Sequence, residues 1–253
     1  MQISDDIFLG SAFIGGSNVS PAGDPSPMTV GVGPLGRVYL FDIVPAASGT
    51  TTTQNEIALT QTTAGAANLV LTANGTTTTA GVAPDGSGTA VVVLDCARTV
   101  AIYSTGSFGA VNFTVYGYDQ YGQPMTQQIA GPANSTVQTT KCFKSVSRIS
   151  TSAIVGTAVY AGLGTGIGLP YRASDVGYFL SVVFNETAVT ISSTACKKGD
   201  VTSPATISTT DPRGYIVTGQ TDGSKRLVAA IGIPALGSGP NATRIGAVGV
   251  TQF

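Results

Sequence analysis

The chain has 253 residues, enough for one large domain or two small ones with a buried core. Only 12 Lys and Arg and 13 Asp and Glu serve this length, so charged residues make up 10% of it, against about 25% in ordinary soluble domains. Histidine is absent, and Glu56 and Glu186 are the only glutamates. These absences exclude serine-histidine-aspartate and cysteine-histidine catalysis, histidine-ligated metals and imidazole switches.

The composition favours strands over helices. Thr, Val and Gly are abundant, whereas the Glu and Lys residues that populate helix surfaces are scarce. No long window keeps the apolar period of an amphipathic helix, which argues against an α/β fold. We therefore predict an all-β protein, an antiparallel β-sandwich or jelly-roll-like fold, with an extended N-terminal arm and room for a second small β unit.

The arm comprises residues 1–36 and is rich in Pro, Gly and Ser, as extended segments are. Apolar side chains within it would be costly to leave in water, so we expect Ile7, Phe8 and Phe13 to bind a partner surface, in this domain or in a neighbour. The first strand expected after the arm covers residues 37–44.

Beyond Pro45, short apolar runs alternate with turn signals. Strands are expected over residues 56–60, 68–72, 90–94, 111–118, 125–130, 178–184, 188–192, 214–218, 226–233 and 244–252. Asn74-Gly75 predicts a type I′ hairpin turn. Asn185-Glu186 is expected to be the turn of a further hairpin.

The glycine-rich run from Gly162 to Pro170 predicts a turn and a hinge. The chain would then divide into the arm (1–36), a β domain (37–161) and a C-terminal β portion (162–253), which could also belong to the same domain. The run has no G-x-G-x-x-G register and no helix start behind it, so we predict no nucleotide site there.

The cysteines, Cys96, Cys142 and Cys196, have no metal-ligand spacing and are odd in number. We predict free structural thiols in a protein made in a reducing cytoplasm. No catalytic, cofactor-binding or metal-binding residue is predicted, no cofactor is expected, and the protein is not expected to be an enzyme.

The uncharged stretch between Arg148 and Arg172 is long enough to span a bilayer, but its glycines and hydroxyl groups argue against insertion. Asp5 and Asp6 stand where a secretory signal would carry positive charge, so export by a cleaved signal is not expected. A net charge of -1 offers no general attraction to nucleic acid. We therefore expect neither a membrane nor a nucleic acid as a partner.

Charge is unevenly distributed along the chain. Acidic residues outnumber basic ones in residues 1–100, and the reverse holds in residues 101–253. Lys141, Lys144 and Arg148 lie close together in sequence, which makes them candidate partner-binding residues for an acidic surface or another copy of the chain. The alternative is that they are ordinary solubilising charges.

Several segments share a pattern with one class of proteins. They are residues 116–123 (YGYDQYGQ), 143–149 (FKSVSRI), 164–171 (GTGIGLPY), 211–215 (DPRGY) and 225–228 (KRLV). Together they resemble bacteriophage virion proteins, especially the cement or decoration proteins of tailed phages. The resemblance implies a β-rich protein assembled in the host cytoplasm and bound in the virion outside the shell of the major capsid protein. It also implies a homo-oligomer, with a trimer favoured over a dimer, and no catalytic residue.

We therefore predict a cement or decoration protein that binds and stabilises a phage capsid shell. The alternative is a receptor- or glycan-binding tail or spike module of a phage, whose exposed tyrosines would stack on sugars. Those tyrosines would be Tyr103, Tyr116, Tyr118 and Tyr121. A hydrolase that uses convergent aspartates is the least favoured interpretation.

Overall fold

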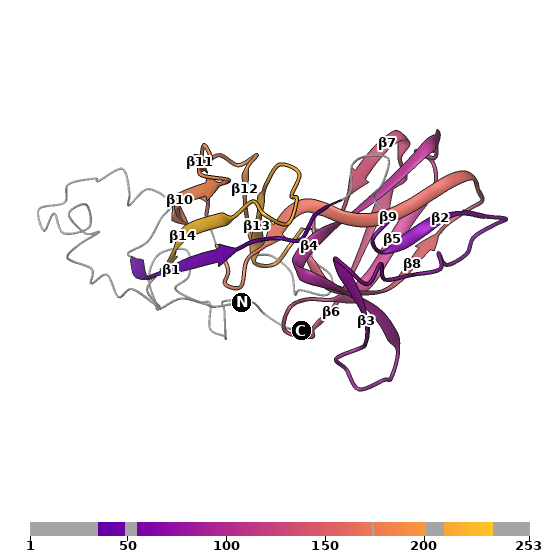
Figure 1. Cartoon of the computed structure of the whole chain (residues 1–253), viewed down its shortest axis with the longest axis horizontal. Helices are drawn as coiled ribbons and strands as arrows, with labels where there is room; N and C mark the ends of the chain where they lie inside the picture. The colour runs from indigo at the N-terminus through magenta and orange to yellow at the C-terminus, as the bar shows by residue number, and fades with distance from the viewer. Residues whose placement is uncertain (1–34, 49–54, 174, 201–209, 235–253) are drawn as a thin grey trace, which may run out of the picture.

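The computed structural model describes residues 35–48, 55–173, 175–200 and 210–234, and these residues confirm the all-β prediction (Figure 1). They form two antiparallel sheets, with a single 3-10 turn, η1 (Val176–Tyr178), and no α-helix within the described ranges. No helix in this part of the chain is long and apolar enough to cross a membrane.

The larger sheet has 10 strands and curls into a half-barrel. Its main path runs in the order β12-β13-β9-β4-β8-β5-β6, while β2 pairs with β9 and both β3 and β7 pair with β4. The strands are β2 (Ala58–Thr63), β3 (Thr78–Val82), β4 (Ala90–Ser107), β5 (Asn112–Tyr118), β6 (Pro124–Ala130), β7 (Ala133–Gln138), β8 (Phe143–Thr151), β9 (Val155–Gly168), β12 (Cys196–Lys198) and β13 (Gly214–Val217).

The smaller sheet has four strands in the order β1-β14-β10-β11. They are β1 (Leu35–Ile43), β10 (Phe179–Phe184), β11 (Thr187–Ala188) and β14 (Leu227–Pro234). The hairpin expected at Asn185-Glu186 is confirmed: both residues have positive φ, 50° and 60°, as in the type I′ turns that match the twist of two-residue hairpins.

Strand β4 organises the larger sheet. It is 18 residues long and changes neighbours along its length: β3 and β8 flank its first part, and β9 and β7 flank its second. Breaks in register on either side of Arg98 mark the change. The sequence predicted only residues 90–94 as a strand, so the second half of β4 is a new finding.

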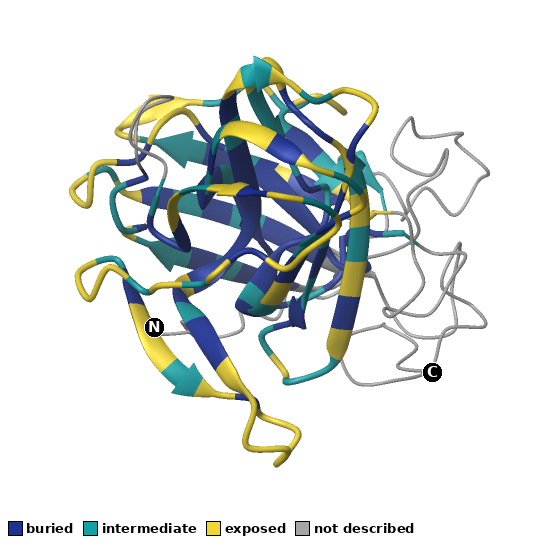
Figure 2. Cartoon of the chain, turned by 90° about the vertical axis from the view of Figure 1, so that its right-hand side faces the viewer, coloured by how far each residue is buried: buried dark blue, intermediate teal, exposed yellow. Residues whose placement is uncertain are grey.

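The two largest hydrophobic clusters lie along β4 and β9. One fills the half-barrel, whose buried lining is visible in Figure 2, and includes Ile102 of β4 and Leu163 of β9. The other lies between the smaller sheet and the larger one, and includes Cys96 within β4 and Ile167 near the end of β9. The two parts of the fold therefore share strands, and the division at residue 162 stays a prediction.

The glycine-rich turn predicted at residues 162–170 is wrong, because the run belongs to β9 and pairs with β4 and β13. Its glycines recur at every second residue, so they share one face of the strand. Side chains of neighbouring residues occupy that face: a Cβ at Gly164 would lie 2.2 Å from Thr99 Oγ1, and one at Gly168 would lie 2.7 Å from Cys142 Cβ.

The type I′ turn predicted at Asn74-Gly75 is also wrong. Gly75 has positive φ, but Asn74 does not. Instead, Asn74 Oδ1 accepts the backbone N–H groups of Thr76, Thr77 and Thr78 at 3.0, 2.8 and 3.0 Å. The asparagine therefore caps the entry into β3, as short polar side chains commonly do in turns.

Other differences concern strand extent. Residues 68–72 form only a bridge between Asn68 and Ser150, and the strand expected over 188–192 is limited to β11. Strands β3, β7, β8, β9 and β12 lie outside the strand ranges predicted from the sequence. The strand expected over 244–252 and most of the arm, residues 1–34, lie outside the described residues.

Alanine substitutions in β9 test the packing of its glycine face. We expect Gly164→Ala to lower the free energy of unfolding by about 1–3 kcal/mol, because the added methyl group overlaps Thr99 and Gln138. Gly156→Ala in the same strand is the matched control, since a Cβ there has no atom within 4 Å. Urea denaturation measures both, and equal effects would contradict this account of the face.

Candidate functional site

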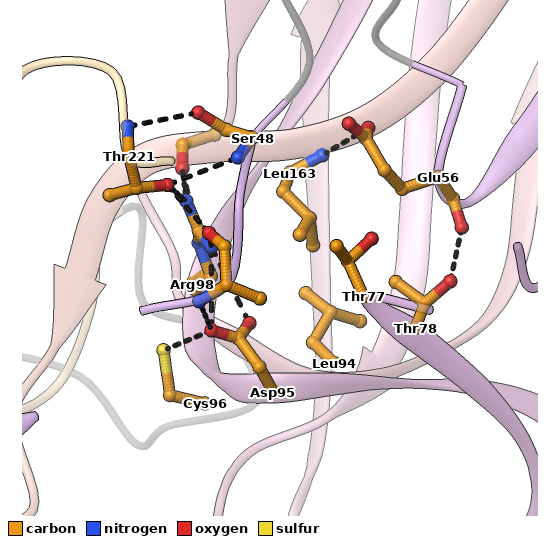
Figure 3. Close-up of polar contacts among 12 residues, drawn as sticks. Ser48, Glu56, Thr77, Thr78, Leu94, Asp95, Cys96, Arg98, Leu163 and Thr221 are labelled. Atoms are coloured by element: carbon orange, nitrogen blue, oxygen red, sulfur yellow. Dashed lines mark hydrogen bonds and ion pairs between the residues drawn. The ribbon is translucent and has the colours of Figure 1, made fainter. Parts of the chain in front are cut away.

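The first candidate site is a buried junction centred on Arg98 (Figure 3). Its side chain is 0% exposed. Nε and Nη2 donate to Gly164 O at 3.2 and 2.9 Å, Nη1 donates to Ala46 O at 2.9 Å, and Nη2 also donates to Thr221 Oγ1 at 3.0 Å. Nη1 completes the set by pairing with Asp95 at 3.4 Å. Every N–H of the guanidinium thus has an acceptor.

Thr221 extends this junction to the segment that follows β1. Its hydroxyl donates to Ala46 O at 2.7 Å and accepts from Ser48 N at 3.1 Å. In return, Thr221 N donates to Ser48 Oγ at 3.3 Å. Hydrogen bonds therefore join the segment after β1 to the loop between β13 and β14. Arg98 of β4 in turn binds both of these segments and β9.

A second carboxylate in this region, that of Glu56, holds the segment before β2. Glu56 is 5% exposed, and its Oε2 accepts Leu163 N of β9 at 3.1 Å. Its backbone oxygen accepts the hydroxyl of Thr78 at the start of β3 (Figure 3). These contacts join strands that are far apart in sequence, so this carboxylate acts as a structural acceptor.

A second junction joins the turn between β5 and β6 to the segments around β9 and β13. Arg213 Nη1 and Asp119 Oδ2 form an ion pair at 2.8 Å, and both side chains are almost fully buried. Asp119 Oδ1 accepts the backbone N–H groups of Tyr121 and Gln123, each at 2.8 Å. The Arg213 guanidinium lies 5.2 Å from the centre of the Tyr121 ring, whose hydroxyl donates to Pro170 O at 2.7 Å.

Asp211 also belongs to this second junction. Its carboxylate accepts Cys142 N at 2.8 Å, Arg213 N at 2.9 Å and Gly214 N at 3.0 Å. Burial raises the pKa of Asp211, and the Arg213 charge together with these three donors opposes the rise. Asp211 N also donates to Thr140 O at 3.1 Å, which ties this segment to the large sheet.

Lys141, expected at a partner surface, lies inside the protein with 0% exposure. Its Nζ donates to Thr126 O of β6 at 3.0 Å. Burial lowers the pKa of Lys141 to about 8, against the opposing charges of Asp211 and Asp200. Lys141 therefore belongs to the second junction, where it lies near Asp211. Its buried ammonium group is not accessible to another protein.

The other predicted basic residues lie elsewhere. Lys144 is half-buried, and its Nζ donates to Leu94 O at 2.6 Å and Asp95 O at 2.9 Å. Arg148 is exposed, with its guanidinium 3.8 Å from the centre of the Tyr116 ring. The three basic side chains therefore occupy different environments, and a partner role for Lys144 and Arg148 stays a prediction.

The apolar residues expected to bind a partner, Ile7, Phe8 and Phe13, lie outside the described residues. Their proposed role is therefore also still a prediction. Among the residues that the structure does describe, no group of three or more His, Cys, Asp or Glu side chains is placed to hold a metal ion.

The thiols are free, as predicted, and all are buried: Cys96, Cys142 and Cys196. Burial raises the pKa of each thiol above its usual value. Since the thiolate is the reactive form, these cysteines are poor nucleophiles in the folded protein.

The tyrosines expected to stack on sugars are Tyr103, Tyr116, Tyr118 and Tyr121. Tyr103 stacks on Tyr160 of the neighbouring strand, with ring centres 5.1 Å apart. Tyr118 is buried, and its hydroxyl donates to Asp85 Oδ2 at 2.6 Å. With Tyr116 against Arg148 and Tyr121 in the second junction, each ring has its own contact. These contacts do not join the rings into one platform.

The residues of the two junctions match no catalytic, metal-binding or nucleotide-binding motif, so the sequence motifs do not identify them. Arg98 follows an apolar run and precedes another, a position that is typically buried in a strand. In a chain with so few charges, a lone arginine there was a signal of an internal ion pair. Asp119, Asp211 and Arg213 lie in segments 116–123 and 211–215, but nothing local in the sequence shows that these segments meet.

Comparison with known proteins finds no matching family model, no matching curated protein and no matching solved structure. The assignments made for this chain therefore rest on its residues and their contacts. The resemblance to virion proteins stays a prediction.

Substitution of Arg98 tests the first junction. We expect Arg98→Met to lower the free energy of unfolding by about 3–5 kcal/mol, because it removes the donors to Gly164 O, one of the two donors to Ala46 O, and the cation that pairs with the Asp95 carboxylate. Arg226→Met removes the arginine of an exposed pair with Asp42 and should change stability very little. Thermal and urea unfolding measure both, and a small effect of Arg98→Met would count against the junction.

The pH dependence of stability tests the burial of Lys141. Between pH 8 and 10.5, the unfolded chain keeps a proton on this lysine that the folded protein has released, so this group makes stability rise with pH. The buried thiols act in the opposite direction, because their folded pKa values are raised. The difference between the wild type and Lys141→Met isolates the lysine.

Between pH 8 and 10.5, we expect the free energy of unfolding of the wild type to rise relative to that of Lys141→Met by on the order of 1 kcal/mol or more. Lys198→Met, at the exposed end of β12, is the control and should leave the pH profile unchanged. Parallel profiles for the wild type and Lys141→Met would show that the lysine titrates as it does in the unfolded chain.

Proposed function

We propose that this protein is a structural component of a bacteriophage virion, a cement or decoration protein that binds the shell of the major capsid protein and stabilises it. In this proposal it has no catalytic role and needs no cofactor. It is assembled in the host cytoplasm as a homo-oligomer, for which a trimer is favoured.

The observation that carries this proposal is the meeting of the resembling segments. Segment 116–123 supplies Asp119 and Tyr121, segment 211–215 supplies Arg213, and segment 164–171 supplies Pro170. The ion pair, the ring contact and the hydroxyl donation described above join all three. Asp211 binds Cys142 N, directly before segment 143–149.

This convergence supports a framework role for the segments that carry the resemblance. Their polar groups face one another and hold turns against strands, which is what a protein needs in order to keep its shape against neighbours. The sparse charge of the chain adds support, because a surface with few charged groups costs less to desolvate than a highly charged one when it is buried against another subunit.

Immunogold electron microscopy of the source virion tests the proposal. We expect an antibody raised against the full chain to label the capsid shell at many positions, because a decoration protein is present in many copies. Label confined to the tail would favour the receptor- or glycan-binding module instead. Virions without label would contradict both, provided that the antibody detects the purified protein.

Binding of the purified protein to undecorated capsids of the same phage measures the second part of the proposal. We expect the full chain to co-sediment with the capsids and deletion of residues 1–36 to weaken binding, because the apolar arm is the expected contact. Native mass spectrometry should show an oligomer. A strictly monomeric protein that ignores capsids would overturn the cement role.

A further inference from the structure

Strand β3 is an edge strand in a hairpin that projects from the body of the protein (Figures 1 and 2). Among the described strands it pairs only with β4. Thr79, Ala80 and Val82 are exposed, and Val82 keeps 64% of its surface accessible. The hairpin therefore presents a row of backbone groups that no described strand covers.

The hydrogen bonds show which backbone groups face outward. Ala83 N donates to Thr89 O at 2.8 Å, so this opposed pair is a hydrogen-bonded one. Because such pairs alternate along an antiparallel ladder, Gly81 also bonds to β4, whereas Ala80 and Val82 point their N–H and C=O groups away from it.

The free part of this edge is bounded on both sides. At one end, Thr78 N donates to Asn74 Oδ1 at 3.0 Å and Thr78 O accepts Gly75 N at 2.9 Å. At the other end stands Pro84, which has no N–H. The outward groups that remain are those of Ala80 and Val82, the edge of an unpaired strand.

Edge strands are usually protected against pairing by charges, prolines or bulges. Strand β3 has the sequence TTAGV, with no charged residue and no proline, and its register with β4 is unbroken. By contrast, β6 at an edge of the same sheet begins with Pro124, and Gln127 Oε1 in it accepts Thr140 N and Lys141 N at 2.9 and 2.8 Å.

We propose that β3 pairs antiparallel with β3 of a second copy of this chain, about a two-fold axis at Gly81. In this register Ala80 of one copy faces Val82 of the other, and each such pair exchanges N–H···O=C bonds in both directions. The two Gly81 residues then face each other in the close, non-hydrogen-bonded position, where the absence of side chains permits the approach.

A second copy fits this edge for three reasons. The free groups of Ala80 and Val82 are related by a two-fold axis, so the strand is complementary to itself. Neither strand brings a charge to the contact. The hairpin also projects from the body, so that two hairpins can meet while the rest of each molecule stays apart (Figure 1).

The contact is small, so we expect weak association in solution and a stronger effect where many copies are held side by side. It does not rest on the proposed virion role, since it needs only two copies of the chain. The capsid-binding assay and the experiment below can therefore fail independently.

Engineered cysteines test the pairing and its register. Facing residues in a hydrogen-bonded pair have Cα atoms about 5.5 Å apart, within disulfide range. We therefore expect a mixture of the Ala80→Cys and Val82→Cys full-length proteins, oxidised with glutathione disulfide, to give a dimer linked between positions 80 and 82. The native thiols are buried and compete poorly. Mass spectrometry of non-reduced peptides identifies which two positions the disulfide joins.

The matched control is Ser87→Cys, at the exposed hairpin tip, which the two-fold axis places far from its copy. The proposal predicts that the yield of the disulfide-linked dimer between positions 80 and 82 exceeds the yield from Ser87→Cys. Equal yields would overturn it. A third variant, Ala80→Pro, removes one outward N–H but no bond to β4. It should abolish the concentration-dependent rise in sedimentation coefficient of the wild type, and a wild type with no such rise at millimolar concentration would equally refute the pairing.

Discussion

The buried guanidinium of Arg98 is the contact on which the arrangement of this fold depends. It lies where β4 exchanges one set of neighbours for another, and it binds β9, the segment after β1 and the loop before β14 at once. An arginine suits this place because its planar group presents donors in several directions and keeps its charge. Desolvating that charge is costly, so the acceptors must all be present together. The junction therefore specifies how the smaller sheet sits against the half-barrel.

The second junction also buries opposite charges together, next to the end of β9 and the start of β13. Asp119, Asp211, Arg213 and Lys141 bring opposite charges inside, where backbone donors and acceptors complete their contacts. Seven of the 25 charged residues of the chain are buried within the described ranges, which leaves fewer charges for the surface: Glu56, Arg98, Asp119, Lys141, Arg172, Asp211 and Arg213. A surface with few charges costs less to desolvate against another protein than a highly charged one, which is consistent with both the proposed virion role and the proposed pairing of β3.

Several elements of the structure show which features the sequence predicts and which it does not. The β class followed from composition, and the Asn185-Glu186 hairpin followed from the two strand-like runs on either side of these residues. The glycine run in β9 predicts a turn because glycine is common in turns and Pro170 follows, and the structure shows a strand instead. Its period of two is a strand signal, but only the side chains of Thr99 and Cys142 in neighbouring segments explain why that face must be bare. The candidate site was harder still: Lys141 was recognised as charged, but its burial depends on β6 and on a segment about 70 residues away in the chain.

What the sequence determined by itself was local: strands in place of helices, one two-residue hairpin turn, free thiols, and no imidazole for catalysis or metal binding. These properties follow from the conformational preferences and chemistry of individual residues, which do not need the fold to express them. Only the tertiary structure decided which strands are neighbours, where β4 changes partners, and which of the few charges are buried together. Those features depend on contacts between residues distant in sequence, and the free energy of such a contact is defined only when the surrounding groups have already excluded water from it.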